Sequence, residues 1–200
     1  TGLNTGGMGA ISPVPFLKKS LLKKIKKTII EPTLTGLKRE NIHYSGFLFF
    51  GLMNVAGDPF VIEFNVRLGD PETQAIMPRI QSDFLNLILT LDNSSEFKKA
   101  EVRINPKSTA TVILTSSGYP EKYVSGHVIT GLDSKSRNSV FFHAGIKVEN
   151  NNYITSGGRV LAVTSLGKNI KDAVKKSYES ILDVQFKNLY FRKDIGYDLI

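Results

Sequence analysis

The stretch of sequence that decides the fold runs from Val61 to Glu72 and reads VIEFNVRLGDPE. Its first half alternates apolar and polar residues, and a period of two predicts a β-strand whose successive side chains point to opposite faces. One face then carries an acid, an amide and a guanidinium, from Glu63, Asn65 and Arg67, where an ordinary sheet face would hold Thr, Val or Lys. The residues expected to pack on the core side are Ile62, Phe64 and Val66.

The polar face of this strand has the chemistry of a metal and phosphate site. A carboxylate and an amide carbonyl two residues apart are hard oxygen ligands suited to Mg²⁺ or Mn²⁺, which commonly keep water and substrate phosphate in their shell. Arg67 can hold a carboxylate or a phosphate through two parallel hydrogen bonds. A surface ion pair between Glu63 and Arg67, with Asn65 merely exposed, would give the same spacing, and spacing alone does not separate the two interpretations.

The flanking residues predict a hairpin before this strand and a helix after it. Residues 44–55 are apolar, aromatic and glycine-rich, and a turn at 56–59 leads into the strand, which is typical of a β-hairpin. After the strand, Asp70 precedes Pro71, and a capping carboxylate before a proline predicts the start of a helix. Apolar residues at three- and four-residue spacing extend this helix to about Asp92.

The charge of the chain is concentrated in one segment. There are 26 Lys and Arg against 18 Asp and Glu, a net charge of +8, which would suit a polyanionic partner. Six lysines lie within residues 18–27 between regularly spaced apolar residues, so this segment is predicted to be an amphipathic helix that Pro32 kinks or splits before it ends near Glu40. No aromatic or arginine residues are interleaved with the lysines, which favours a solvated helix face over a nucleic-acid interface.

The second half of the chain is richer in short strands. The apolar pattern breaks at residues 93–95, so we predict two domains, residues 1–95 and 96–200. The second should be a small antiparallel sheet or open barrel covered by a helix over residues 169–184, giving a mixed α/β protein overall. The predicted strands are residues 109–115, 125–129, 140–148 and 160–164.

Two glycine-rich segments could bind anions through backbone N–H groups. Residues 4–9 form a turn-forming run whose glycines can adopt positive φ, and residues 156–159 place two glycines before an arginine at a strand entrance. Neither segment carries a P-loop lysine or a GxGxxG pattern after a strand. A tight turn is the other interpretation of each segment.

Composition excludes several other classes of protein. With 41% hydrophobic and 22% charged residues the chain has a globular composition, and no apolar stretch reaches the roughly 20 residues that cross a bilayer. The absence of cysteine excludes disulfide frameworks, thiolate zinc sites and cysteine nucleophiles, and favours a reducing, cytoplasmic compartment. The histidines, His43, His127 and His143, lie far apart and are interpreted as structural or surface residues.

Several motifs, in order along the chain, resemble the C-terminal part of the phosphoribosylamine-glycine ligase (glycinamide ribonucleotide synthetase) family of ATP-grasp enzymes. The resemblance covers essentially the whole chain, and the ordered set is far more specific than a single glycine pair. The motifs are residues 4–13 (NTGGMGAISP), 63–74 (EFNVRLGDPETQ), 155–161 (TSGGRVL) and 191–197 (FRKDIGY).

This resemblance implies an ATP-dependent ligase of purine biosynthesis. ATP would phosphorylate the carboxylate of glycine, and the amine of 5-phosphoribosylamine would attack the acyl phosphate to give glycinamide ribonucleotide. The resemblance implies Mg²⁺ or Mn²⁺ held by Glu63 and Asn65, with Arg67 as the catalytic group at the phosphate and glycine end of the site. By weaker analogy with related purine ligases, Arg159 is the candidate for the ribose 5-phosphate. The implied substrate-binding residues are Asn4, Thr5, Gly6, Gly7, Met8, Asp70, Gly158 and Arg159.

The sequence departs from the family pattern in two respects. The N-terminal half of the family, with the rest of the ATP-grasp portion and the adenine pocket, is absent, and the chain begins at Thr1 without a methionine. The chain is therefore expected to be a fragment, inactive alone, whose partner is that missing half. Leu3 stands where a proline usually precedes the glycine-rich run of residues 4–9, the glycine loop. The alternatives to the enzyme are a basic module that binds RNA or an acidic partner, and a structural remnant that scaffolds a partner.

Overall fold

The computed structural model describes residues 5–133 and 139–200, and the chain falls into two compact units. Unit 1 is discontinuous, and unit 2 is formed by the two segments inserted into it. This division does not follow the predicted boundary at residue 95, which stays a prediction. Unit 1 comprises Thr1–Pro13, Asp70–Gln81 and Arg103–Ile200, and unit 2 comprises Val14–Gly69 and Ser82–Val102.

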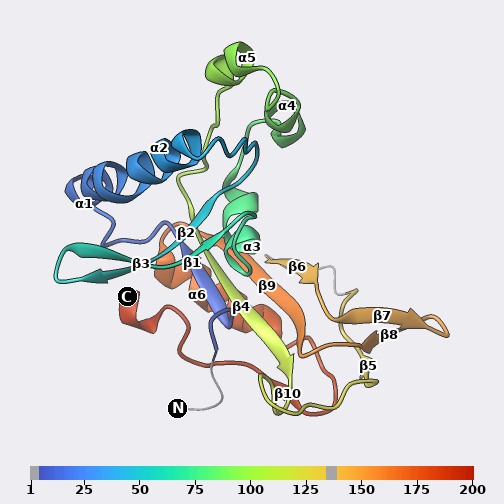
Figure 1. Ribbon diagram of the computed structural model, residues 1–200. Coiled ribbons are helices and arrows are strands. Elements are labelled where there is room, and N and C mark those ends of the chain that lie inside the picture. The colour runs from blue at the N-terminus through green and yellow to red at the C-terminus, as the bar shows by residue number, and fades with distance from the viewer. Residues whose placement is uncertain (1–4, 134–138) are drawn as a thin grey trace. The chain divides into compact units, whose positions relative to one another are not determined.

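A five-stranded antiparallel sheet is the centre of unit 1 (Figure 1). Four strands lie in the order β1-β4-β9-β6, and β10 pairs with β4. Every residue of β4 is buried, so both of its faces are covered. An antiparallel sheet in this half of the chain confirms the prediction. The strands are β1 (Gly9–Ser12), β4 (Ser108–Ser116), β6 (Ser139–His143), β9 (Arg159–Gly167) and β10 (Leu189–Tyr190).

Two helices cover the opposite faces of this sheet. On one face, Ala110 of β4 packs against Ala173 and Val174 of α6 (Ile170–Ile181). The neighbouring Thr109 donates its hydroxyl to the carbonyl of Ala75 in α3 (Glu72–Ile76) at 2.6 Å. Because neighbouring strand residues point to opposite faces, α3 lies on the side away from α6. The threonines of β4 are therefore tolerated inside the unit because their hydroxyls have partners.

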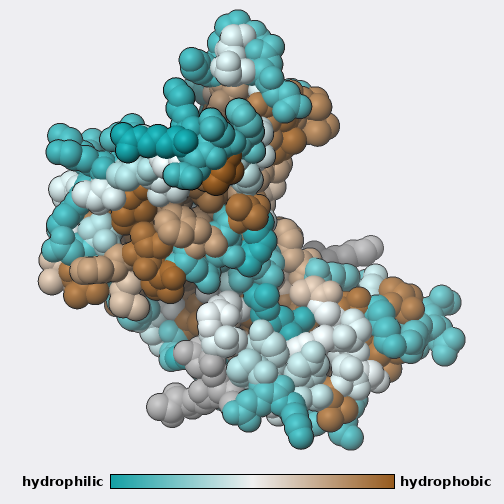
Figure 2. Space-filling model, in the orientation of Figure 1, coloured by the Kyte–Doolittle hydropathy of each residue, from teal (hydrophilic) through white to brown (hydrophobic). Residues whose placement is uncertain are grey.

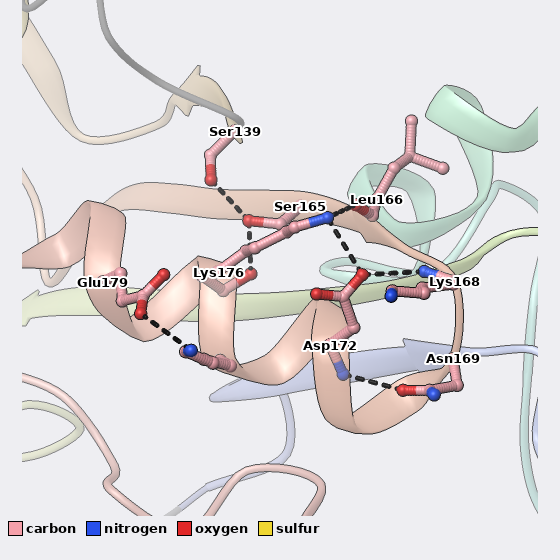
Figure 3. Close-up of polar contacts among 10 residues, drawn as sticks. Ser139, Ser165, Leu166, Lys168, Asn169, Asp172, Lys176 and Glu179 are labelled. Atoms are coloured by element: carbon pink, nitrogen blue, oxygen red, sulfur yellow. Dashed lines mark hydrogen bonds and ion pairs between the residues drawn. The ribbon is translucent and has the colours of Figure 1, made fainter.

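Polar contacts fix the start of α6 (Figure 3). Asn169 is the N-cap, and its side chain accepts from the backbone N–H of Asp172 at 2.9 Å. The Asp172 carboxylate accepts from the backbone N–H of Lys168 and from the Nζ of Lys176, both at 2.9 Å. Both hydrogen bonds hold the pKa of Asp172 below its ordinary value, and the one from the Lys168 backbone has the larger effect. The predicted helix over residues 169–184 is thus confirmed with a defined cap.

Asp172→Asn should lower the melting temperature at neutral pH, because the neutral amide loses the ionic contact to Lys176 and accepts more weakly from Lys168. The pKa of Asp172 is lowered in the folded state, so its stabilisation is present above the unfolded pKa and is lost as pH falls through the folded value. Melting curves from pH 7 to pH 3 should show the difference between wild type and variant shrinking with acid. Glu179→Gln, in the more exposed pair with Lys175, is the control, and an equal loss in both variants would contradict this role.

A second, three-stranded sheet completes the β-structure of unit 1, in the order β5-β8-β7. The predicted strand over residues 140–148 is wrong as one element, because β6 ends at His143 and the chain then enters the second sheet. The break falls at Gly145, where a Cβ would lie 2.7 Å from the Arg159 carbonyl and from the Gly157 Cα. The predicted strand over residues 125–129 is reduced to β5, and β8 and β1 were not predicted. The strands are β5 (Val128–Ile129), β7 (Ile146–Glu149) and β8 (Asn152–Thr155).

Tyr178 of α6 holds the last segment of the chain. Its hydroxyl donates to the carbonyl of Arg192 at 2.7 Å and accepts from the N–H of Ile195 at 3.0 Å, and burial raises the pKa of Tyr178 to about 12. Ile195 in turn covers Gly9 of β1, where a Cβ would come within 2.7 Å of the Ile195 side chain. The C-terminal segment is thereby packed against the strand that follows the glycine loop.

Tyr178→Phe should reduce the free energy of unfolding by about 1–3 kcal/mol, because the Arg192 carbonyl and the Ile195 N–H both lose their partner. Chemical denaturation at neutral pH measures this change. Tyr197→Phe is the matched control, since in the described part of the chain Tyr197 contributes a ring contact to Tyr178 and no hydroxyl hydrogen bond. Equal stability of the two variants would show that the hydroxyl of Tyr178 does not hold this segment.

Unit 2 begins with the predicted lysine-rich helix. The helix consists of α1 (Lys19–Ile25), a π-helical turn (Lys26–Ile30) and α2 (Glu31–Arg39). The irregular turn comes just before Pro32, where the sequence predicted a kink or split. The lysines are exposed and the buried positions are Leu21, Ile25 and Ile29, which confirms the amphipathic pattern.

A two-stranded hairpin follows in unit 2, formed by β2 (Phe49–Val55) and β3 (Asp58–Asn65). It confirms the predicted hairpin, and its turn at Ala56 and Gly57 has positive φ at both residues. The Asp58 carboxylate at the start of β3 forms an ion pair with Lys24 of α1. Helices α4 (Phe84–Leu89) and α5 (Ser94–Lys99) complete the unit.

The single helix predicted from Pro71 to Asp92 is wrong. The helix begins near Pro71 as expected, but α3 ends at Ile76, and a 3-10 turn at Met77–Arg79 leads to an extended Ile80. Pro78 interrupts the helical hydrogen bonds, and Asp83 caps a separate α4 by accepting from the Asn86 N–H at 3.1 Å. The apolar spacing in the sequence therefore continues across a point where the helix itself is interrupted.

No helix among residues 5–133 and 139–200 is both long and apolar enough to span a membrane.

Candidate functional site

The carboxylate and amide predicted to hold a metal lie side by side on β3. The Asn65 Nδ2 donates to the Glu63 Oε1 at 2.9 Å, which confirms that the two side chains share a face. Gly51 of β2 lies opposite Glu63, and a Cβ at Gly51 would come within 2.8 Å of the Glu63 Cγ. The absence of a side chain at Gly51 therefore leaves the room in which the Glu63 side chain lies.

Arg67 does not continue the alternation of this strand. β3 ends at Asn65, and the Arg67 guanidinium donates to the carbonyl of Leu68 at 3.0 Å. In the part of the chain that the structure describes, no ion pair joins Arg67 to Glu63, whose recorded partner is Asn65. The prediction that all three polar side chains share one strand face is thus correct for the first two and does not extend to Arg67.

The apolar face of β3 is not a core in this chain. Ile62, Phe64 and Val66 are 63%, 51% and 72% exposed, so the predicted core side is wrong here. Phe64 packs edge to face on Phe50, with ring centroids 5.4 Å apart. Figure 2 shows hydrophobic surface over the hairpin and near α4, and the exposed residues there include Met53, Phe60, Leu85 and Leu89.

The donor chemistry of Glu63 and Asn65 fits a partial site for a hard divalent cation. Among the described residues no group of three His, Cys, Asp or Glu side chains could hold a metal ion. Mg²⁺ is usually bound by one or two carboxylates together with water and substrate phosphates rather than by an all-protein cage. A single carboxylate beside an amide oxygen therefore suits Mg²⁺ or Mn²⁺ when phosphate and further ligands are supplied.

In unit 1 the structure brings together residues that are far apart in the sequence. The Arg159 guanidinium donates to the Asp70 backbone carbonyl at 2.9 Å and to the Asp70 carboxylate at 2.8 Å. A Cβ at Gly7 would lie 2.8 Å from the Arg159 Nη1, so the glycine loop passes directly over the guanidinium. Asp70 does not cap α3 as predicted; the N-cap is Pro71, without a side-chain cap bond.

The glycine loop is anchored on its C-terminal side. Met8 is buried, and its carbonyl accepts from the N–H of Ile113 in β4 at 3.1 Å. Gly7 has a φ of 99°, a conformation that residues with side chains rarely adopt. Thr5 and Gly6 precede these two residues, and Asn4 lies outside the described residues.

The second glycine segment is a tightly packed turn. The Ser116 N–H donates to the Gly158 carbonyl at 2.8 Å, and the Ser116 hydroxyl donates to the Gly157 carbonyl at 3.0 Å. A Cβ at Gly158 would lie 2.1 Å from the Tyr119 ring. These contacts account for the glycines without a ligand, and a substrate-binding role of Gly158 stays a prediction.

The candidate residues thus form two sets, each within one unit. Glu63, Asn65 and Arg67 belong to unit 2, and the loop residues, Asp70, Gly158 and Arg159 belong to unit 1. Sequence reasoning missed Gly51, which reveals itself only through its cross-strand position, and Gln74, whose Nε2 donates to the Asp70 carboxylate at 3.0 Å. The four-residue spacing from Asp70 to Gln74 was a usable signal, since side chains so spaced are close together near a helix, although Asp70 itself precedes α3.

Comparison with known proteins first defines the class. Residues 1–73 match the family model described as phosphoribosylglycinamide synthetase, ATP-grasp (A) domain. The biotin carboxylase of Campylobacter jejuni, 14% identical, aligns over 91% of this chain with a TM-score of 0.60. The fold is therefore that of the ATP-grasp enzymes.

The family follows from the rest of the chain. Residues 109–198 match the phosphoribosylglycinamide synthetase C domain, so both matched segments come from one family, and the chain belongs to the phosphoribosylglycinamide synthetase family. The crystal structure of phosphoribosylamine-glycine ligase from Thermotoga maritima is similar, with 34% identity and a TM-score of 0.83 over 98% of this chain and 48% of that one.

Two curated relatives are similar to nearly the whole of this chain. Phosphoribosylamine-glycine ligase of Fusobacterium nucleatum is 44% identical over 98% of this chain and 46% of its own length. A bifunctional purine biosynthetic protein of Pichia angusta is 44% identical over 98% of this chain and 25% of its own length. The chain spans at most about half the length of these relatives.

Proposed function

We propose that this chain is the C-terminal part of an ATP-dependent ligase that joins glycine to 5-phosphoribosylamine, giving glycinamide ribonucleotide in purine biosynthesis. The observation that carries the proposal is the similarity of 98% of the chain to a phosphoribosylamine-glycine ligase at 44% identity. The adjacent side chains of Glu63 and Asn65 support it independently, because their oxygen atoms suit a divalent cation that accompanies phosphate. A cytoplasmic location is part of the same proposal.

The proposed reaction needs charge neutralisation more than covalent help from the protein. The glycine carboxylate takes the γ-phosphoryl group of ATP, ADP leaves, and the amine of phosphoribosylamine then attacks the acyl carbon with loss of a proton and release of phosphate. Glu63 and Asn65 would hold Mg²⁺ or Mn²⁺, which supplies positive charge to the phosphate oxygens. Arg67 would stabilise charge on the glycyl phosphate, since such reactions depend on positioned cationic groups.

The remainder of the site would come from the rest of the ligase. The chain spans 46% of the length of a similar ligase, and the exposed apolar face of the hairpin would be available for burial against the preceding half of such a ligase. That half would bind the adenine and much of the triphosphate. The isolated chain should therefore show no ligase activity.

Glu63→Gln and Asn65→Leu in the full-length ligase should each abolish most turnover at ordinary Mg²⁺ concentrations while leaving the melting temperature unchanged. Glu63→Gln replaces the charged carboxylate by a neutral amide, which binds the metal more weakly, and Asn65→Leu removes the amide oxygen altogether. The measurement is the initial rate against Mg²⁺ concentration. Asp58→Asn, on the same strand and paired with Lys24, is the control that should keep the wild-type dependence. Wild-type metal dependence in both site variants would refute the metal assignment.

Arg67→Ala should lower kcat by about 100-fold, the magnitude expected when a transition-state donor is removed, with little change in the KM of phosphoribosylamine. Steady-state kinetics with each substrate varied in turn measures both constants. Arg39→Ala, at the exposed end of α2, is the matched control for the loss of one positive charge. A kcat within a few-fold of wild type would remove Arg67 from the proposed role.

Binding of RNA or an acidic partner through the lysine face of α1 is the alternative function. The exposed lysines allow it, but no further observation favours it over a solvated helix surface. Weak, unselective binding that falls steeply with salt and needs no metal would support this alternative.

A further inference from the structure

Three distant segments of unit 1 meet at the Arg159 side chain. Arg159 begins β9, Asp70 precedes α3, and Gly7 precedes β1. The guanidinium reaches Asp70 twice, at the backbone carbonyl and at the carboxylate, with distances of 2.9 and 2.8 Å. Its Nη1 also lies only 2.8 Å from the position that a Cβ at Gly7 would take.

Each oxygen of the Asp70 carboxylate is hydrogen-bonded to another side chain of unit 1. Its Oδ1 accepts from the Gln74 Nε2 at 3.0 Å, and its Oδ2 accepts from the Arg159 Nη2 at 2.8 Å. The helix-borne Gln74 therefore orients the carboxylate, and the carboxylate orients the guanidinium. Both oxygens have a protein partner, which favours a positioning role for Asp70 over direct binding of substrate.

The loop has little room to move against this group. Gly7 has a φ of 99° and lies close to the Arg159 Nη1. A Cβ at Gly7 would also lie 3.3 Å from the Asp70 carbonyl oxygen. Met8, the next residue, is buried and bonded to β4. The position of Gly7 thus depends on the positions of the Arg159 guanidinium and the Asp70 carbonyl group.

We propose that Asp70 and Arg159 form a latch that fixes residues 5–9 of the glycine loop, so that both are positioning residues for the substrate that this loop binds. The importance of the loop for substrate rests on the proposed function; the latch itself rests on the contacts of unit 1. Side chains of Arg159 and Asp70 are 28% and 48% exposed, and an ion pair this accessible adds little to global stability. Its consequence should therefore be local.

The test is a double-mutant cycle of Asp70→Ala and Arg159→Ala in the full-length ligase, read by hydrogen exchange of the peptide that covers residues 5–9. Each single variant should speed exchange there by up to about fivefold, the range of one partly exposed ion pair. The double variant should be no faster than Arg159→Ala, because Arg159→Ala already removes both contacts to Asp70, whereas Asp70→Ala leaves the one to its backbone carbonyl. Gly7→Ala, which pushes a Cβ into Arg159, should raise the exchange as well. Glu149→Ala, which breaks the exposed pair with Lys147, is the control and should leave the loop unchanged.

Kinetics on the same variants separates the latch from a phosphate anchor at Arg159. The latch predicts that both single variants raise the KM of phosphoribosylamine, Arg159→Ala at least as much as Asp70→Ala, and that the double variant does not exceed Arg159→Ala. If Arg159 alone raises this KM, Arg159 is the phosphate anchor and the latch is overturned. Exchange of residues 5–9 that stays at the wild-type rate, or additive single effects, would also overturn it. Failure of the proposed ligase function would remove the kinetic readout but not the exchange result.

Discussion

The pairing of β4 with β9 is the interaction on which the rest of unit 1 depends. Both strands are almost wholly buried, and their ladder runs from Ser108 opposite Gly167 to Thr115 opposite Arg159. Apolar side chains of β4 face α6, while threonine hydroxyls on the other face bond to α3 and to Thr164. β1, β6 and β10 all attach to this pair, so the glycine loop before β1 and the Arg159 at the start of β9 are both placed by it.

The hairpin of unit 2 follows a different physical rule. Each of its strands is paired along one edge only, and Phe60, Ile62 and Phe64 of β3 remain largely exposed. A two-stranded hairpin is marginal alone and gains stability when a face packs on something else. The geometry of Glu63 and Asn65 is local and survives this exposure, because it depends on strand alternation and on the space left by Gly51.

The sequence predicts correctly those parts of the structure that depend on the regular spacing of residues along one strand or helix. The shared face of Glu63 and Asn65, the lysine-faced helix and the helix α6 all follow from residue spacing. The helix beyond Ile76 was predicted wrongly because apolar spacing continued while Pro78 and Asp83 ended one helix and began another. The partners of Arg159 could not be predicted, since Gly7, Asp70 and Arg159 meet only through tertiary packing of distant segments.

The insertion of unit 2 into unit 1 has a consequence for how the chain folds. β1 finds its partner β4 only after the whole of unit 2 intervenes, and Gly9 is covered by Ile195 near the other end of the sequence. Contacts of such long sequence separation form slowly, because the loop-closure entropy is lost before the contact compensates it. During synthesis on the ribosome, the hairpin and the lysine-rich helix of unit 2 can therefore form first, whereas the strand beside the glycine loop pairs only after β4 has emerged and is covered only after Ile195 has.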